Sequence, residues 1–263
     1  MIPQIIFLGT AGDSFVYGKQ LRMSGGFVLK VGRYQFIVDP GPGALMRANL
    51  CGVNLRETTA VIATHSHVNH ASEINAVVGA MTYNGMDRLG VVIANKTVVD
   101  GSDDYIPALS NFHKSCVERV MGIESGQRVG IENMEVIALK AMHDDPDAIG
   151  LKFVTPEFVL CYTGDTGYSE ELSEQYKGCD ILILNTVHAS GEKSDINLSS
   201  DDAIKIIKVA MPKLAIITHF GKSMLSSNPQ MAARIIQKET DVQVLAATDG
   251  LVISPNYYSS SSK

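Results

Sequence analysis

The sequence predicts an α/β (α+β) protein with two packed β-sheets covered by helices. Two observations predict this class: strand–turn–strand patterns dominate the first third of the chain, and apolar strands alternate with helical patterns in the rest. A third, the lack of any linker or shift in composition, favours one domain over several. We assign residues 1–258 to this domain and expect residues 259–263 to form a disordered tail.

Composition restricts the classes of function. With 263 residues, 45% of them hydrophobic, the chain can bury a large core. It lacks an apolar run of about 18 residues and a basic leader, so we expect neither a membrane span nor a signal peptide. Four widely spaced cysteines predict buried free thiols and a cytoplasmic location rather than a disulfide framework. The net charge of −6 argues against broad affinity for nucleic acid.

The first third of the chain predicts antiparallel strands. Strands are expected at residues 5–8, 27–31 and 34–38. The last two flank the turn Gly32-Arg33 and form a hairpin. The loop at residues 39–43, Asp-Pro-Gly-Pro-Gly, then ends the sheet, and a helix is predicted over residues 44–49. Such a loop is either simple punctuation or a place where the backbone approaches a ligand.

A histidine-rich loop carries the strongest functional signal. It follows a predicted strand at residues 59–63 and reads Thr-His-Ser-His-Val-Asn-His over residues 64–70. His65 and His67 are two positions apart, so at the end of a strand their side chains project to the same side. His70 begins the next segment, which predicts a helix. Neutral imidazoles bind divalent transition metals, so we predict a metal site; the alternative is a polar loop that happens to be rich in histidine.

Further histidine and aspartate residues follow later strands. His143, Asp165 and His219 each come at the carboxyl end of a predicted strand, along one edge of the sheets. Asp165 has an alternative interpretation as the N-cap of a helix that starts near Ser169. We interpret His113, in a predicted helix, as a surface or packing residue. The remaining expected elements are helices at residues 71–81, 199–210 and 231–237 and strands at residues 89–94, 134–141, 151–154, 158–162, 180–184, 214–218, 242–246 and 251–253.

These motifs together resemble a known family. The histidine-rich loop, followed in order by His143, Asp165 and His219, resembles the metal-binding motifs of the metallo-β-lactamase superfamily. Four further runs resemble most its ribonuclease Z-like branch, in particular uncharacterised archaeal members. They lie at residues 8–12, 39–43, 163–167 and 218–221. The resemblance covers nearly the whole chain and implies a four-layer αββα sandwich with a metal centre at the edge of the two sheets.

The resemblance also implies a set of ligands. One metal would be bound by His65, His67 and His143, a second by His70 and His219, and Asp165 would bridge the two. The cofactor is then a divalent transition metal, as one or two ions, with zinc preferred and manganese or iron as alternatives; no other cofactor is expected. A metal-bound hydroxide would be the nucleophile, because bound cations lower the pKa of water toward about 7.

Two positions depart from the family's pattern. The family usually has Asp where this chain has Asn69, and that aspartate ligates the second metal and handles protons. Asn69 cannot act as a base, and its alternative role is to cap the following helix. Ribonuclease Z enzymes carry a histidine that contacts the scissile phosphate, and the corresponding position here is Asn197; His188, at the end of the preceding strand, is a substitute. Asn69, His188 and Asn197 are therefore the candidate catalytic residues.

Three functions follow from these observations. The first is a metal-dependent hydrolase of phosphodiester or related ester bonds. The second is a transfer-RNA 3′-processing ribonuclease Z, which the acidic charge and the absence of a recognisable basic, Gly/Pro-rich arm disfavour. The third is a metal-binding protein with weak or no hydrolysis. The expected partner is a small-molecule or nucleotide-like substrate, with neither transfer RNA nor a membrane, and a homodimer is kept open as the assembly.

Overall fold

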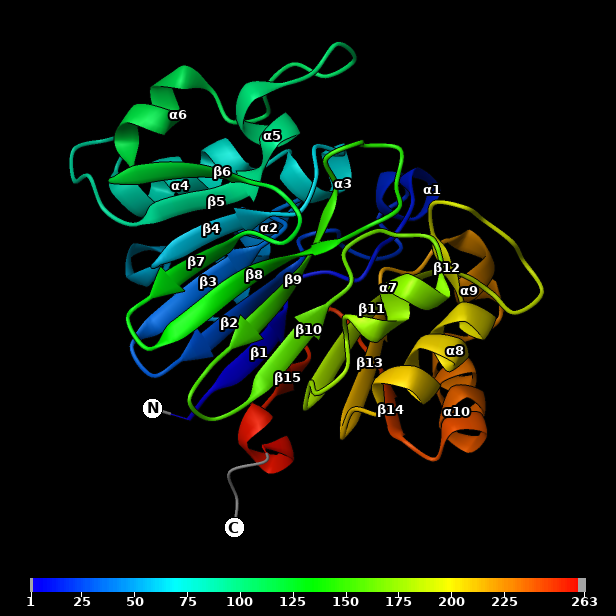
Figure 1. Ribbon diagram of the computed structural model, residues 1–263. Coiled ribbons are helices and arrows are strands. Elements are labelled where there is room, and N and C mark those ends of the chain that lie inside the picture. Colours follow the sequence, from blue (N-terminus) through cyan, green and yellow to red (C-terminus); the bar gives the residue numbers. More distant parts are fainter. Residues whose placement is uncertain (1, 260–263) are drawn as a thin grey trace. The chain divides into compact units, whose positions relative to one another are not determined.

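The computed structural model describes residues 2–259, which form two compact units, each with its own sheet and helices (Figure 1). The chain passes between the units more than once. The first unit holds residues 2–10, 20–124 and 248–254, and the second holds 11–19, 125–247 and 255–259. Of the predicted disordered tail, residues 260–263 lie outside the described residues, whereas Ser259 follows a short 3-10 helix.

The first unit contains a mixed sheet in the order β15-β1-β2-β3-β4-β5-β6. The pairs from β15 to β3 are antiparallel and those from β3 to β6 are parallel. The predicted hairpin at Gly32 forms β2 and β3, with the glycine at a φ of 56°. The strands are β1 (Gln4–Phe7), β2 (Phe27–Val31), β3 (Tyr34–Val38), β4 (Ala60–Ala63), β5 (Val91–Asn95), β6 (Arg119–Ile123) and β15 (Val252–Ile253).

Helices of this unit pack against its sheet through an apolar core. Val61 and Ala63 of β4 contribute to this core together with Val77 and Met81 of α4, all of them buried. The helices are α2 (Ala44–Leu50), η1 (Leu55–Glu57), α3 (Val68–Ala71), α4 (Ile74–Thr82), α5 (Lys96–Asp100) and α6 (Asn111–Cys116). This arrangement places the loop that follows β4 at the carboxyl ends of parallel strands.

The helix predicted over residues 71–81 is two helices, α3 and α4. Glu73 separates them with a φ of −101° and a ψ of 12°. Its carboxylate accepts hydrogen bonds from the amides of Gly43 (2.6 Å) and Leu45 (2.8 Å) at the start of α2. A carboxylate there satisfies amides that a helix N-terminus leaves without partners. This long-range contact explains a break that the local apolar spacing does not predict.

The second unit contains a sheet in the order β14-β13-β11-β10-β9-β8-β7, with β12 paired to β11. The pairs from β14 to β10 are parallel and those from β10 to β7 are antiparallel. The strands are β7 (Arg128–Ile131), β8 (Met134–Lys140), β9 (Ile149–Val154), β10 (Val159–Tyr162), β11 (Ile181–His188), β12 (Leu198–Ser199), β13 (Leu214–Thr218) and β14 (Gln243–Ala246).

The helices of the second unit share a core with this sheet. Leu182 and Leu184 of β11 lie in that core with Ile206 and Ile207 of α8, and all four are buried. Ser199 and Asp202 form a reciprocal capping box that starts α8. The helices are α1 (Ser14–Gly18), α7 (Glu170–Glu174), α8 (Ser200–Ala210), α9 (Lys222–Ser226), α10 (Pro229–Thr240) and η2 (Pro255–Tyr258).

Several short elements are absent from the prediction. Strands β6 and β7 are edge strands whose side chains are mostly exposed or half-buried, so they lack the apolar pattern of a buried strand. Helices α1 and α9 span five residues each, too short for a clear helical period. The strand predicted at residues 180–184 extends to His188, so that this histidine is part of β11.

The burial of the four cysteines can be compared with the prediction from the sequence. Cys116, Cys161 and Cys179 are buried free thiols as predicted, whereas Cys51 is half-buried. A hydrogen bond with Cys179 and burial raise the pKa of the Cys161 thiol.

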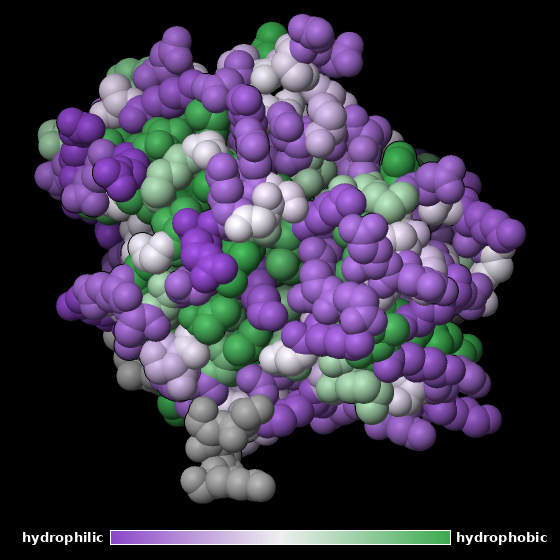
Figure 2. All heavy atoms as spheres, in the orientation of Figure 1, coloured by the Kyte–Doolittle hydropathy of each residue, from purple (hydrophilic) through white to green (hydrophobic). Residues whose placement is uncertain are grey.

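No helix within residues 2–259 is both long and apolar enough to cross a bilayer. Hydrophilic side chains cover much of the face in Figure 2, with apolar residues visible between them.

Candidate metal centre

The histidine-rich loop of the first unit is held by one buried carboxylate. Asp39 follows β3, is 1% exposed and has a φ of 52°. Its Oδ1 accepts hydrogen bonds from the amide (2.7 Å) and the hydroxyl (3.1 Å) of Thr64, and that hydroxyl lies 2.9 Å from Oδ2. Nδ1 of His70 lies 2.9 Å from Oδ2. Asp39 therefore ties the start of the histidine loop to α3.

These contacts determine which ring nitrogen of two histidines carries the proton. An ionised carboxylate only accepts hydrogen bonds, so His70 donates to Asp39 through Nδ1–H. The Thr64 hydroxyl donates its single hydrogen to Asp39, so its oxygen, 3.1 Å from Nδ1 of His65, accepts a hydrogen bond from that nitrogen. Both rings then present Nε2 as an acceptor. Metal-ligating histidines are held in this way by an outer hydrogen bond.

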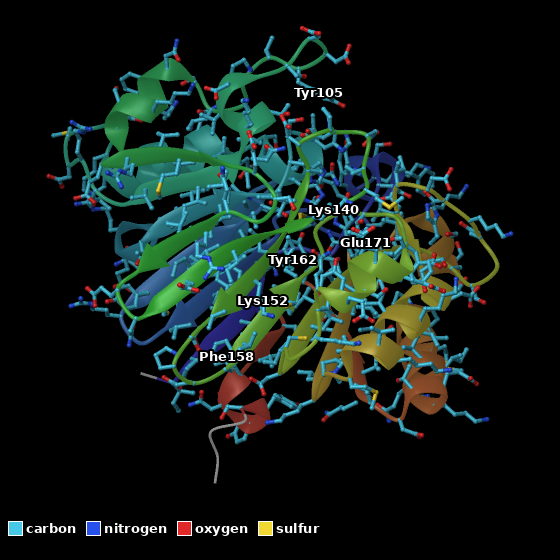
Figure 3. All side chains as sticks on the ribbon, in the orientation of Figure 1. Tyr105, Lys140, Lys152, Phe158, Tyr162 and Glu171 are labelled. Atoms are coloured by element: carbon cyan, nitrogen blue, oxygen red, sulfur yellow. The ribbon has the colours of Figure 1, made fainter. Side chains whose placement is uncertain are left out.

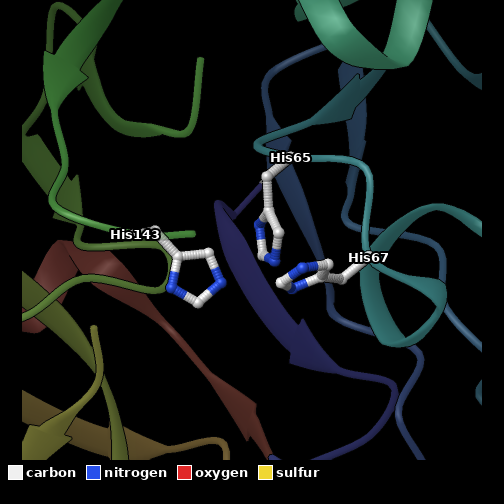
Figure 4. Close-up of side chains that lie close together, drawn as sticks. All are labelled: His65, His67 and His143. Atoms are coloured by element: carbon white, nitrogen blue, oxygen red, sulfur yellow. The ribbon is translucent and has the colours of Figure 1, made fainter. Parts of the chain in front are cut away.

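The three histidines of this loop lie close together. The ring centroids of His65 and His67 are 4.8 Å apart, and those of His65 and His70 are 4.0 Å apart. Potential ligand atoms of His65 lie within 4.8 Å of those of both His67 and His70. Figure 4 shows the rings of His65 and His67 turned toward one another.

In the second unit, Asp165 lies beside two histidines. Its Oδ2 is 3.2 Å from Nε2 of His219 and 4.0 Å from Nε2 of His143. Nδ1–H of His143 donates to the carbonyl oxygen of Ile196 at 2.8 Å, because a carbonyl can only accept. Nε2 of His143 also lies 3.0 Å from the half-exposed carboxylate of Asp144, so this nitrogen faces two carboxylates.

Asp165 is itself held by a buried amide. Asn185 on β11 donates through Nδ2 to Oδ1 of Asp165 at 2.6 Å and to the hydroxyl of Tyr162 at 3.0 Å. This contact leaves Oδ2 of Asp165 toward the two histidines. The N-cap of α7 is Ser169, whose hydroxyl accepts from Leu172, so the alternative of Asp165 as that cap is wrong.

The backbone at His219 explains one of the glycine motifs. His219 follows β13 with a φ of 62°, a conformation that costs free energy in a residue with a side chain. A bridge between Ala11 and Phe220 and a hydrogen bond from Gly12 N–H to the Phe220 carbonyl (2.9 Å) hold this turn. A Cβ at Gly12 would overlap the carbonyl of His219. Gly12 is thus required by a close approach of two backbone segments.

The loop at residues 39–43 has a similar role. A Cβ at Gly41 would overlap the backbone carbonyl of Asn69, which also accepts a hydrogen bond from the Ser24 hydroxyl at 3.0 Å. The backbone of this loop thus packs against the histidine-rich loop.

Asp39 and Asn185 are two positioning residues that sequence reasoning missed. The only signal for Asp39 was its place between a strand and a Pro-Gly loop, and Asn185 had none.

The three candidate catalytic residues lie in different surroundings. Asn69 lies inside α3, whose N-cap is His67, so the alternative of Asn69 as a helix cap is wrong. The amide of Asn197 donates to Ser194 Oγ at 3.1 Å, next to the Ile196 carbonyl that holds His143. Nδ1 of His188 lies 3.0 Å from Oε2 of Glu192, which also accepts from Ser223.

His113 lies in α6, as predicted. Its Nδ1 is 2.8 Å from the Ser110 hydroxyl, its ring packs edge-on against Phe112, and burial lowers its pKa. Its Nε2 comes within 3.6 Å of a Cβ built at Gly79 of α4, so its role is packing between helices.

The candidate metal ligands of the two units indicate a class of protein. The buried side chains of His65, His70 and Asp165 are each oriented by an outer hydrogen bond, as is that of His143. Imidazoles and a carboxylate held in this way fit a divalent metal ion. The chain belongs to the metallo-β-lactamase superfamily: the profile of the Beta-lactamase superfamily domain matches residues 34–220. The family is generally one of metallo-hydrolases, and its fold class is the predicted mixed α/β sandwich with two sheets.

Two relatives support the predicted ribonuclease Z-like branch. An uncharacterised protein of Methanocaldococcus jannaschii is 32% identical over 255 residues, covering 96% of this chain and 95% of the relative. The ribonuclease Z of Methanothermobacter thermautotrophicus is 23% identical over 310 residues, covering 98% of both.

Two solved structures show the same fold. The metallo-β-lactamase fold protein YhfI from Bacillus subtilis has a TM-score of 0.79 at 18% identity, over 96% of this chain and 99% of that one. A diphosphatase from the PhnP family has a TM-score of 0.71 at 16% identity, over 96% of this chain and 97% of that one.

Proposed function

We propose that this protein is a metal-dependent hydrolase of phosphodiester or related ester bonds. The observation that carries the proposal is the outer hydrogen bond on Nδ1 of His65, His70 and His143, which leaves Nε2 of each ring able to bind a metal. When Nδ1 is held in this way, Nε2 of the same ring is prepared for ligation before the metal arrives. A polar loop that holds histidines by chance would not orient His65 and His70 alike.

The proposed ligands form two sets. His65, His67 and His143 would hold the first ion, His70 and His219 would hold the second, and Asp165 would be a further ligand. Asn185 supports this role, because it holds Oδ1 of Asp165 and leaves Oδ2 near two histidines. Zinc is the ion that an imidazole-rich set with one carboxylate favours.

Divalent ions at such a site supply Lewis acidity and activate water as a nucleophile near neutral pH. The residues of the chain supply orientation and proton transfer. Asp39 holds the ring of His70 through a charge-assisted hydrogen bond and acts on His65 through the Thr64 hydroxyl. We infer that His188, whose Nδ1 is bound to Glu192, uses Nε2 to contact the leaving group.

The substrate is proposed to be small. The net charge of −6 supports a small phosphodiester over transfer RNA, because phosphate contacts from Lys and Arg dominate affinity for nucleic acid. A protein whose structure is named as a diphosphatase from the PhnP family shares the fold, which is consistent with a phosphate-containing substrate. Asn69 lacks the charge of a metal-bound carboxylate, so we expect slow turnover.

The experiment combines metal analysis with a panel of substrates. The purified protein should contain one to two divalent ions per chain and should hydrolyse at least one of a phosphodiester, a phosphonate ester, a lactone and a thioester. His65→Ala and His143→Ala should each lose metal and activity together. His113→Ala is the matched control, because this histidine packs between helices and should keep both.

Each result distinguishes the functions. Metal without hydrolysis of any substrate in the panel would favour the metal-binding protein over the hydrolase. Retention of full metal content in His65→Ala and in His143→Ala would contradict the proposed ligand set. Loss of metal in His113→Ala would assign the effect to folding rather than to ligation.

A further inference from the structure

A loop of the first unit places a tyrosine on the histidine-rich loop. The loop connects α5 to α6 and carries Tyr105 (Figure 3). It begins at Gly101, which has a φ of 80°, and the amide of Ser102 donates to the carbonyl of Tyr105 at 2.8 Å. A Cβ at Gly101 would come within 2.6 Å of that carbonyl. The turn therefore requires glycine and determines the position of the tyrosine backbone.

The other end of this loop is anchored in the core. Leu109 is fully buried, and its amide donates to the carbonyl of Val98 at 3.2 Å. The side chain of Asn75 on α4 donates to the carbonyl of Ala108 at 2.8 Å and accepts from the amide of Ser110 at 3.0 Å. Both ends of the loop are thus held, so the tyrosine is presented by a defined backbone.

The tyrosine hydroxyl contacts a proposed metal ligand. Oη of Tyr105 lies 3.2 Å from Nε2 of His67, and the two ring centroids are 5.9 Å apart at 53°. The distance fits a hydrogen bond with the hydroxyl in reach of the imidazole edge. The contact joins residues 38 positions apart in the chain.

His67 differs from its neighbours in the nitrogen that it uses. The outer hydrogen bonds of His65 and His70 are made by Nδ1, whereas that of His67 is made by Nε2. We propose that Tyr105 is a positioning residue for His67: its hydroxyl oxygen accepts a hydrogen bond from Nε2–H, so that His67 would bind metal through Nδ1. The inference rests on the proposed metal function, and it adds the residue that orients this ligand.

The physical consequence follows from the tautomer. A neutral imidazole carries one proton, so a hydrogen bond that holds it on Nε2 leaves the lone pair on Nδ1. Loss of the hydroxyl removes the preference between the two tautomers and between two orientations of the ring. Removal of an outer partner of a ligating histidine typically lowers metal affinity about 10–100-fold.

The test compares Tyr105→Phe with Tyr83→Phe. Tyr105→Phe keeps the ring that packs near His67 and removes only the hydroxyl. Tyr83 lies in the same unit, is 57% exposed and has its ring 4.3 Å from the Arg56 guanidinium. Its ring therefore packs with Arg56 rather than with His67, which makes it a matched control. Competition with a chelator should show affinity for the first ion reduced about 10–100-fold in Tyr105→Phe and unchanged in Tyr83→Phe.

A double-mutant cycle tests whether the effect passes through His67. In a His67→Ala background, Tyr105→Phe should lower metal affinity no further. Equal affinity in the wild type and Tyr105→Phe would overturn the inference while leaving the metal function standing. An undiminished loss in the His67→Ala background would also overturn it, since the tyrosine would then act elsewhere.

A second measurement does not depend on metal. The ¹⁵N chemical shifts of His67 in the metal-free protein report which ring nitrogen carries the proton. We expect the Nε2–H tautomer in the wild type and in Tyr83→Phe, and a mixture in Tyr105→Phe. An Nδ1–H tautomer in the wild type would overturn the inference even if the protein binds no metal.

Discussion

Oδ2 of Asp39 lies 2.9 Å from Nδ1 of His70, with both side chains at most 2% exposed. The same carboxylate accepts both hydrogen bonds of Thr64, whose hydroxyl in turn lies against His65. One buried charge therefore orients two proposed ligands, of which one is reached through an intermediate hydroxyl. Such a group affects metal binding without touching the metal.

Asp39→Asn should weaken metal binding about 10–100-fold. An amide places an NH2 group where the carboxylate accepts, so one donor of Thr64 or His70 is left facing another donor. Asn also tolerates the positive φ of this position, so the change tests charge rather than backbone strain. Chelator competition and urea unfolding of the metal-free protein measure the effect, which should include about 1–3 kcal/mol of lost stability.

Asp87→Asn is the control for this substitution. Asp87 pairs with Arg56 at the surface with its side chain 56% exposed, and such pairs contribute at most about 1 kcal/mol. Metal affinity that falls equally in both variants would contradict the role of Asp39.

Gly12→Ala should disturb His219 and destabilise the protein by about 1–3 kcal/mol. The added Cβ would overlap the His219 carbonyl, so the turn that presents this ligand must shift. Gly18→Ala is the matched control in the neighbouring helix α1, where a Cβ meets nothing within 4 Å. It should be neutral or stabilising by about 0.4–1 kcal/mol. Thermal unfolding and metal analysis of the two variants measure these effects. Unchanged metal content in Gly12→Ala would argue against His219 as a ligand.

Asn69→Asp should tighten the second metal site. The substitution restores one negative charge beside the proposed ligands His70 and His219, and a cation is attracted to that charge. If the protein hydrolyses a phosphodiester, the new carboxylate should also raise the rate by about 10²–10⁴-fold as a proton-transfer group. Metal titration of the two metal-free proteins, with hydrolysis measured alongside, provides the comparison. Equal second-site affinity and equally low activity would favour the non-catalytic function.

Transfer-RNA precursors should be poor substrates at physiological salt. The chain has 22 Lys and Arg against 28 Asp and Glu, so few cations are available for a long run of phosphates. Cleavage of a labelled precursor, compared with that of a small phosphodiester at the same enzyme concentration, measures this preference. Specific 3′ cleavage at low enzyme concentration would support the ribonuclease Z function instead.

The sequence by itself determined the fold class and supplied the candidate residues for metal binding. The hairpin at Gly32 and the strands before His65 and His219 follow from local rules of turn chemistry and apolar spacing. Those rules depend on near neighbours in the chain. Edge strands and short helices carry little of that signal, which is why β6, β7, α1 and α9 were missed.

Only the tertiary structure decided how the proposed ligands are oriented. Asp39 contacts His70 across 31 positions, the Ile196 carbonyl contacts His143 across 53, and Tyr105 contacts His67 across 38. No local pattern encodes these pairs, because each depends on packing that brings distant segments together. Ring tautomers and the break between α3 and α4 follow from such contacts, whereas the presence of the histidines follows from the sequence.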